Sequence, residues 1–203
     1  MKTATAIGAA LAVVTLTTVP ALAAAQKYTV KGENAYASFY QYDDNCSYTN
    51  VYVSAFNNIT KSAPGAPTSQ QGSYLSYDSY NYCTGAYSYG SGFSDTPTFT
   101  IANSLKSATL SGTYTVFDYY SGTSKTAVVD LTWTSTGNTY RGNSHSHYQG
   151  PGYISNYRTK STSSEAQVTG SITIEGTNII ANLPSYGSLS SSNDGSLTVY
   201  KRN

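Results

Sequence analysis

Two histidines separated by a single residue are the side chains of this sequence best suited to chemistry. His145 and His147 flank Ser146 and are the only histidines in the chain. In a β-strand, residues i and i+2 point to the same side, so both imidazoles could hold one divalent metal ion. The carboxylates that could complete such a site are Asp118, Asp130 and Glu165. The competing interpretations are a pair of exposed histidines in a loop, or histidines packed beside Tyr148, and neither binds a metal.

Hydrolytic chemistry has weaker support in the sequence. A glycosidase needs two convergent carboxylates, and the ten Asp and Glu residues are widely scattered. The Gly-x-Ser-x-Gly pattern that presents the nucleophile of many serine hydrolases does not occur. We therefore identify no catalytic residue, and the sequence favours a binding or structural protein over an enzyme.

Tyrosine is abundant, with 21 residues. Residues 33–43 and 48–56 each alternate between small apolar and Tyr-rich positions, which predicts a hairpin with a turn at residues 43–45. The tyrosines that would share its outward face are Tyr36, Tyr40, Tyr42, Tyr48 and Tyr52, and Tyr74 and Tyr80 are expected to adjoin it. Because Tyr combines a flat apolar ring with a hydroxyl group, this face suits a sugar ring or another protein surface. Alternatively, a second layer covers the face and makes it part of the core.

The elements that must position these side chains are β-strands. Alternation of apolar and polar residues predicts a hairpin that joins residues 108–120 to residues 126–134. Its buried stripe would contain Val129, Leu131 and Trp133. The single Trp of the chain is therefore expected in the core, where it cannot serve as a platform for a ligand.

Other parts of the chain divide into apolar strands and polar connections. Further strands are expected at residues 166–175, 179–183 and 197–199. The polar segments 57–72 and 185–195 are predicted to be loops. In total the sequence predicts about nine or ten strands and no helix. This indicates an all-β domain, an antiparallel β-sandwich or a jelly-roll-like fold.

Cys46 and Cys83 are the only cysteines. In an exported chain, an even pair of cysteines predicts one disulfide. A bond between them would close a loop of about 37 residues and contribute roughly 3–4 kcal/mol in the loop-entropy model. The alternative is a pair of free thiols.

The first residues have the pattern of a secretion signal. Lys2 is followed by an apolar run at residues 6–19 and by Ala21-Leu22-Ala23, which fits a cleavage site. We therefore predict a signal peptide at residues 1–23 and a single β-sandwich domain at residues 24–203. The mature protein would be secreted or extracellular, in the periplasm or at the cell surface, without a membrane span.

Charge is balanced in the predicted mature chain. Without Lys2, ten Lys and Arg residues stand against ten Asp and Glu residues, and charged residues form no long run. Nucleic-acid binding usually needs a basic stripe, and the sequence shows none, so we predict no nucleic-acid partner. The expected partner is an extracellular polysaccharide or a protein, and the expected cofactor is a divalent metal if the histidine pair binds one.

Three short segments of the sequence are distinctive: residues 116–122 (VFDYYSG), 129–137 (VDLTWTSTG) and 141–148 (RGNSHSHY). With these segments the chain resembles a family of small secreted bacterial proteins that has no assigned activity. The resemblance implies bacterial export and a shared β-rich fold. It assigns no catalytic residue.

Overall fold

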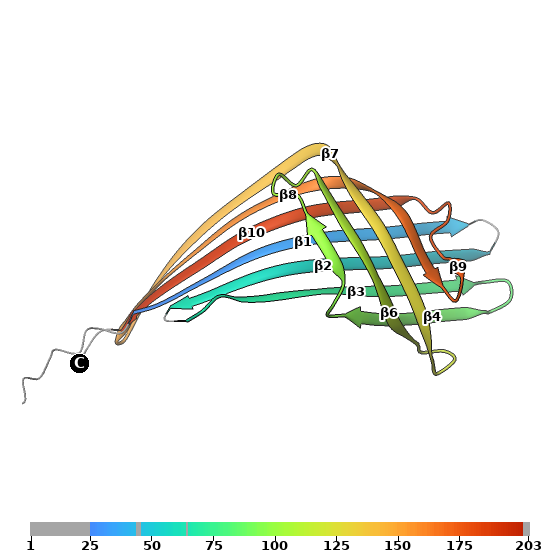
Figure 1. Ribbon diagram of the computed structural model, residues 1–203, viewed down its shortest axis with the longest axis horizontal. Helices are drawn as coiled ribbons and strands as arrows, with labels where there is room; N and C mark the ends of the chain where they lie inside the picture. Colours follow the sequence, from blue (N-terminus) through green and yellow to red (C-terminus); the bar gives the residue numbers. More distant parts are fainter. Residues whose placement is uncertain (1–24, 44–45, 64, 201–203) are drawn as a thin grey trace, which may run out of the picture.

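The computed structural model describes residues 25–43, 46–63 and 65–200. These residues form ten β-strands and no helix, which confirms the predicted all-β, antiparallel fold (Figure 1). The longer strands are β1 (Ala25–Asp43), β2 (Ser47–Ala63), β3 (Thr68–Asn81), β6 (Ser107–Asp118), β7 (Thr123–Gly150), β8 (Tyr153–Ile174) and β10 (Ser185–Tyr200). The shorter strands are β4 (Tyr87–Ser94), β5 (Thr98–Ile101) and β9 (Thr177–Asn178). The predicted signal peptide, residues 1–23, lies outside the described residues.

All ten strands belong to one sheet. Its order is β10-β1-β2-β3-β4-β6-β7-β8-β9, with β5 paired to β6. A further pairing between β10 and β8 closes the sheet on itself. Figure 1 shows β6 and the first half of β7 crossing over β1, β2 and β3, so the two facing layers are parts of one continuous sheet. In the part of the chain that the structure describes, no helix is long and apolar enough to cross a membrane.

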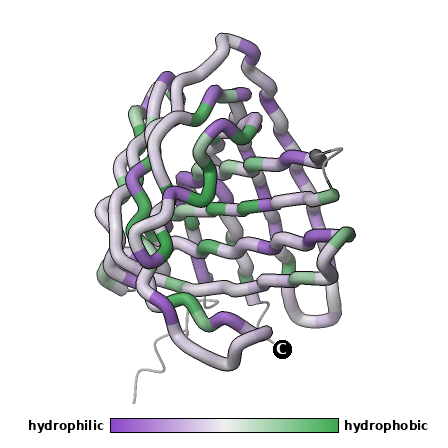
Figure 2. The backbone as a smooth tube through the Cα atoms, turned by 90° about the vertical axis from the view of Figure 1, so that its right-hand side faces the viewer, coloured by the Kyte–Doolittle hydropathy of each residue, from purple (hydrophilic) through white to green (hydrophobic). Residues whose placement is uncertain are grey.

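The core lies between these two layers. Successive side chains of a strand point to opposite faces, so every second side chain points into the core. Figure 2 shows the resulting alternation of hydrophobic and hydrophilic positions along the strands. Val129, Leu131 and Trp133 of β7 are fully buried, as predicted. The indole N–H of Trp133 donates a hydrogen bond of 2.7 Å to the backbone carbonyl of Tyr36. Trp133 is therefore part of the core, and its only polar atom has a partner.

The two polar segments predicted to be loops are instead mostly strands. Residues 57–63 and 68–72 belong to the hairpin of β2 and β3, and residues 185–195 belong to β10. β10 pairs with β1 on one side and with β8 on the other. Strand pairing satisfies the backbone N–H and C=O groups whatever the side chains, so a Ser-rich segment can be held as a strand between two neighbours.

The polar strand ends continue beyond the core and form a separate part of the sheet. We call this part the extension; it comprises residues 25–33, 57–63, 68–71, 139–150, 153–164 and 190–200. Figure 1 shows it as the tapering end where β7, β8, β10 and β1 converge. A register shift between Ser135 and Thr139 marks the point where β7 leaves the core. β7 pairs with β6 only up to Thr134, so residues 139–150 are paired on one side, with β8.

The predicted disulfide between Cys46 and Cys83 is confirmed. It joins the turn residue just before β2 to the turn that follows β3, across a sequence separation of 37 residues. The backbone N–H of Tyr82 also donates a hydrogen bond of 2.6 Å to the carbonyl of Cys46. The two turns at this end of the sheet are therefore linked both covalently and through the backbone.

Candidate functional site

The five tyrosines predicted to share one face all lie on the outer side of β1 and β2. They alternate with the buried residues Ala35, Ala37 and Phe39 on β1 and with Val51 and Val53 on β2. The most exposed are Tyr42, Tyr40 and Tyr52, with exposed fractions of 60%, 52% and 38%. Tyr36 and Tyr48 are half-buried. The face is open to solvent, so the alternative in which it forms part of the core is wrong.

The register aligns four tyrosines across four neighbouring strands. Tyr42 of β1 lies opposite Tyr48 of β2, Tyr48 opposite Tyr80 of β3, and Tyr80 opposite Tyr87 of β4. We call these four residues the tyrosine row. Because neighbouring strands are about 4.8 Å apart, the row is about 14 Å long. Sequence analysis placed Tyr42 and Tyr48 on this face and Tyr80 next to it, but only the register shows that Tyr80 lies in line with them and that Tyr87 continues the line.

Tyr82 joins the tyrosine row from the turn after β3. Its ring centroid lies 5.0 Å from that of Tyr80, 5.9 Å from that of Tyr42 and 6.1 Å from that of Tyr48. The disulfide follows at the next residue and restrains this turn. Since Tyr has few rotatable bonds and its neighbours here are fixed, the aromatic surface is largely preorganised for a ligand.

The hydroxyl groups of Tyr48 and Tyr82 have raised pKa values. The Asp78 carboxylate beside Tyr48 raises the pKa of the Tyr48 hydroxyl to about 12. Burial raises the pKa of Tyr82 above its ordinary value. These hydroxyls therefore remain neutral and can donate or accept hydrogen bonds at the edge of the aromatic surface.

His145 and His147 lie on the inner face of the extension, the side that is continuous with the core. His145 is opposite Arg158 of β8, and His147 is opposite Asn156. The Nδ1 atom of His147 lies 2.8 Å from the Oδ1 atom of Asn156, so the imidazole donates to this amide when Nδ1 carries the proton. The nearest cross-strand partners of the two histidines are thus a cation and an amide, and neither is a metal-binding carboxylate.

The three carboxylates considered as further metal ligands lie elsewhere. Asp118 is buried at the end of β6, Asp130 is on the outer face of β7, and Glu165 is on the outer face of β8. Glu165 accepts hydrogen bonds of 3.0 Å from Asn138 and from Tyr140, and these donors lower the pKa of its carboxyl. Among residues 25–43, 46–63 and 65–200, no group of three His, Cys, Asp or Glu side chains could hold a metal ion. The metal hypothesis stays a prediction that depends on the two histidines alone.

The carboxylate of Asp118 is buried. The sequence pattern suggested Asp118 only as a metal ligand and gave no sign of its burial. This carboxylate accepts a 2.6 Å bond from Lys125, 3.0 Å bonds from the backbone N–H groups of Tyr120 and Ser121, and a 3.2 Å bond from the Tyr77 hydroxyl. The Lys125 ammonium group, followed by the Ser121 amide, holds the pKa of Asp118 well below its ordinary value. The partners of Asp118 come from the turn after β6, from β7 and from β3, and together they satisfy a buried carboxylate, so we interpret this cluster as a structural ion pair.

One grouping was missed at the level of sequence. The basic residues are scattered along the chain, and the sequence therefore predicted no basic surface. The structure corrects this expectation, because the inner face of the extension gathers Lys27, Lys31, Lys61, Arg141, Arg158 and Lys160. These residues come from four strands, and no spacing rule within a single strand would have revealed them.

Comparison with known proteins assigns no family to the chain. No family model matches it, and no curated protein matches it. One similar solved structure is an ATTH from Nitrosomonas europaea, with 9% identity and a TM-score of 0.32, over 85% of this chain and 52% of that protein. Another is an acetoacetate decarboxylase-like enzyme from Sphingomonas wittichii RW1, with 10% identity and a TM-score of 0.30, over 89% of this chain and 93% of that one. This chain thus spans about half the length of the ATTH, and we take no residue role from either protein.

Proposed function

We propose that the protein is a secreted, non-enzymatic binding protein that holds an extracellular polysaccharide on its tyrosine row. The observation that carries the proposal is the alignment of Tyr42, Tyr48, Tyr80 and Tyr87 across four strands, with Tyr82 packed against three of them. A line of exposed rings offers apolar faces for sugar rings, and the hydroxyls offer hydrogen bonds for sugar hydroxyls.

A polysaccharide fits this surface better than a folded protein partner does. Protein interfaces usually bury a compact patch with an apolar centre, whereas the four rings of the tyrosine row are aligned across the strands and each carries a polar hydroxyl group. Its length of about 14 Å, set by the strand spacing, accommodates a short stretch of a sugar chain. The disulfide and the predicted signal peptide at residues 1–23 support a location outside the cytoplasm.

Removal of the two exposed ends of the row should abolish retention on a polysaccharide. Tyr42→Ala combined with Tyr87→Ala removes two stacking surfaces, and each loss is expected to weaken binding about tenfold, equivalent to about 1.4 kcal/mol. The measurement is a pull-down of the purified protein on insoluble cellulose, chitin and mannan, with the bound fraction quantified.

Tyr148→Ala is the matched control for this experiment. Tyr148 is 58% exposed on the outer face of β7, but it lies in the extension and contacts Tyr153 instead of the tyrosine row. This variant should be retained like the unmodified protein. Failure of the unmodified protein to bind any of the three polysaccharides, or equal retention of the double variant, would refute the proposal.

A further inference from the structure

We propose that the inner face of the extension is a second binding site, and that its ligand is a linear anionic polysaccharide bearing carboxylate or sulfate groups. This site lies at the opposite end of β1 and β2 from the tyrosine row and on the other face of the sheet. It does not depend on the function proposed for the tyrosine row.

The site is built by one row of cross-strand neighbours. His145 of β7, Arg158 of β8, Gly195 of β10, Thr29 of β1 and Lys61 of β2 lie successively opposite one another. Directly opposed residues of an antiparallel sheet point to the same face, so the five positions form a line across the strands. With about 4.8 Å between strands, this line is about 19 Å long.

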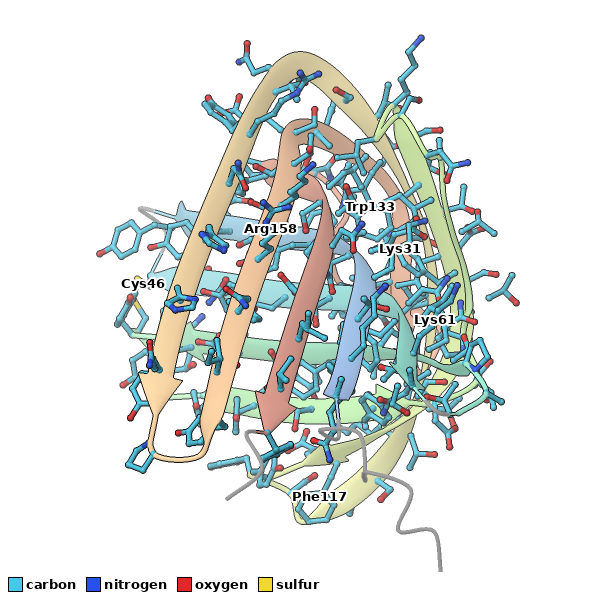
Figure 3. All side chains as sticks on the ribbon, turned by 90° about the vertical axis from the view of Figure 1, so that its left-hand side faces the viewer. Lys31, Cys46, Lys61, Phe117, Trp133 and Arg158 are labelled. Atoms are coloured by element: carbon cyan, nitrogen blue, oxygen red, sulfur yellow. A yellow bond between two sulfur atoms is a disulfide. The ribbon has the colours of Figure 1, made fainter. Side chains whose placement is uncertain are left out.

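The residues in the middle of this line, Gly195 and Thr29, have small side chains and form the floor of a depression. The long side chains of Arg158, Lys61 and Lys27 surround this floor. One hollow of about 450 Å³ is lined by Lys27, Thr29, His145 and Arg158 together with the apolar side chain of Leu197, and a second of about 380 Å³ by Thr29, Lys31 and Lys61 together with that of Ile59. Since the two hollows share Thr29, they adjoin and form one groove, which we call the basic groove. Figure 3 looks onto this end of the molecule and labels Lys31, Lys61 and Arg158.

The basic groove carries a strong excess of positive charge. The cations on this face are Lys27, Lys31, Lys61, Arg141, Arg158 and Lys160, and all six are exposed. The carboxylate on the same face is Glu33, which pairs with Lys31 at 2.7 Å. Among the residues that the structure describes, the other five cations make no ion pair. A protein whose total charge is nearly balanced therefore concentrates its cations on one face, where they attract an anionic ligand.

The spread of the cations favours a polymer over a small anion. They are distributed across four strands and do not converge on one point, as they would around a single phosphate or sulfate ion. Polar groups without charge lie between them, among them Asn156 and Asn193. Amides of this kind suit the hydroxyl groups of a sugar chain, while the cations suit its acidic groups.

A polysaccharide also fits better than a single-stranded nucleic acid. Proteins that bind single strands stack the bases on aromatic side chains. Register places the tyrosines of the extension on its outer face; they are Tyr28, Tyr140, Tyr148, Tyr153, Tyr157 and Tyr200. The inner face of the described extension has no Tyr, Phe or Trp side chain, and its aromatic rings are the two imidazoles of His145 and His147 at one end of the line.

The test measures binding of fluorescently labelled oligogalacturonate and dextran sulfate by anisotropy, with neutral dextran as the reference ligand. We expect the unmodified protein to bind at least one of the two anionic glycans and to ignore neutral dextran. The affinity should fall roughly tenfold when NaCl is raised from about 50 mM to about 200 mM, because salt screens exposed charges. Arg158→Ala and Lys61→Ala should each weaken binding several-fold.

Two further variants separate a shaped site from a general charge effect. Gly195→Leu fills the floor of the groove without changing any charge, and a Cβ atom at this position would meet only the Thr29 methyl group, at 3.8 Å. It should weaken binding at least tenfold while the circular dichroism spectrum is unchanged. Lys106→Ala removes one exposed cation from the turn before β6 and should have no effect. Tyr42→Ala should also leave this binding intact, which distinguishes the basic groove from the tyrosine row.

The proposal is overturned if neither anionic glycan binds, or if Lys106→Ala weakens binding as much as Lys61→Ala does. It is equally overturned if single-stranded DNA of matched length and charge binds more tightly than both glycans, since the ligand would then be a nucleic acid. If Gly195→Leu fails to fold, the comparison of Lys61→Ala with Lys106→Ala decides the matter alone.

Discussion

Trp133→Ala is expected to lower the free energy of unfolding by about 3–5 kcal/mol. The side chain is fully buried between the layers, so its removal leaves a large cavity. Gly187 of β10 packs close to the ring, since a Cβ atom there would lie 3.0 Å from Cδ1 of Trp133. The backbone carbonyl of Tyr36 would also lose the indole N–H that now donates to it. Urea denaturation followed by circular dichroism measures the change, because the variant lacks the only Trp and its fluorescence.

Trp133→Phe separates the two contributions to this loss. This variant keeps much of the apolar volume but removes the hydrogen-bond donor to the Tyr36 carbonyl. It should therefore lower the free energy of unfolding by less than Trp133→Ala does, and the loss of the hydrogen bond should account for about 1–3 kcal/mol of the decrease. A Trp133→Ala protein that unfolds within 1 kcal/mol of the unmodified one, on the order of an ordinary surface substitution, would contradict the role assigned to the ring.

Asp118→Asn is expected to destabilise the fold by about 3–5 kcal/mol at neutral pH, because it leaves the Lys125 ammonium group without its buried partner. The pH dependence follows from the lowered pKa of Asp118 in the folded state. The ordinary pKa of an Asp carboxyl, which applies to the unfolded chain, is about 4. Well above this pH the carboxylate is charged in both the folded and the unfolded state, and its contribution to the free energy of unfolding is complete. As the pH falls below that value, the unfolded chain takes up a proton first, and the stability of the unmodified protein decreases.

The difference between the unmodified protein and Asp118→Asn should therefore narrow as the pH is lowered from 7 to about 3. Urea denaturation at both pH values measures it. Asp130→Asn is the matched control: Asp130 is exposed on the outer face of β7, and its replacement should change stability by less than about 0.5 kcal/mol. A constant difference at both pH values would show that the ion pair is not the source of the stability.

The apolar strands could be predicted from the sequence, and the polar ones could not. The stripe of Val129, Leu131 and Trp133 alternates with polar residues, and this pattern is local. Residues 185–195 and 57–63 have no such stripe, because they are held by neighbours on both sides and cover little of the core. Their polar composition therefore predicted loops where the chain forms strands.

The binding surfaces depend on register, which a single sequence does not contain. Alternation alone put Tyr42 and Tyr48 on an outward face, but the continuation to Tyr80 requires the pairing of β2 with β3. Likewise, Lys61 and Arg158 are almost a hundred residues apart and become members of one groove only through β1 and β10. The histidine pair was recognisable because its spacing is local, while its cationic and amide neighbours were not.

The half-paired segment of β7 bears on self-association. Within the part of the chain that the structure describes, residues 139–150 pair with β8 alone and leave a line of backbone N–H and C=O groups open, and a strand edge of this length can recruit a strand from another molecule. The same segment carries Arg141 and lies beside Arg158 and Lys160. Two copies that joined edge to edge would bring their basic grooves together, and the repulsion between like charges opposes that union. The cations on the inner face of the extension therefore act against edge-to-edge pairing of this strand as well as attracting an anionic ligand.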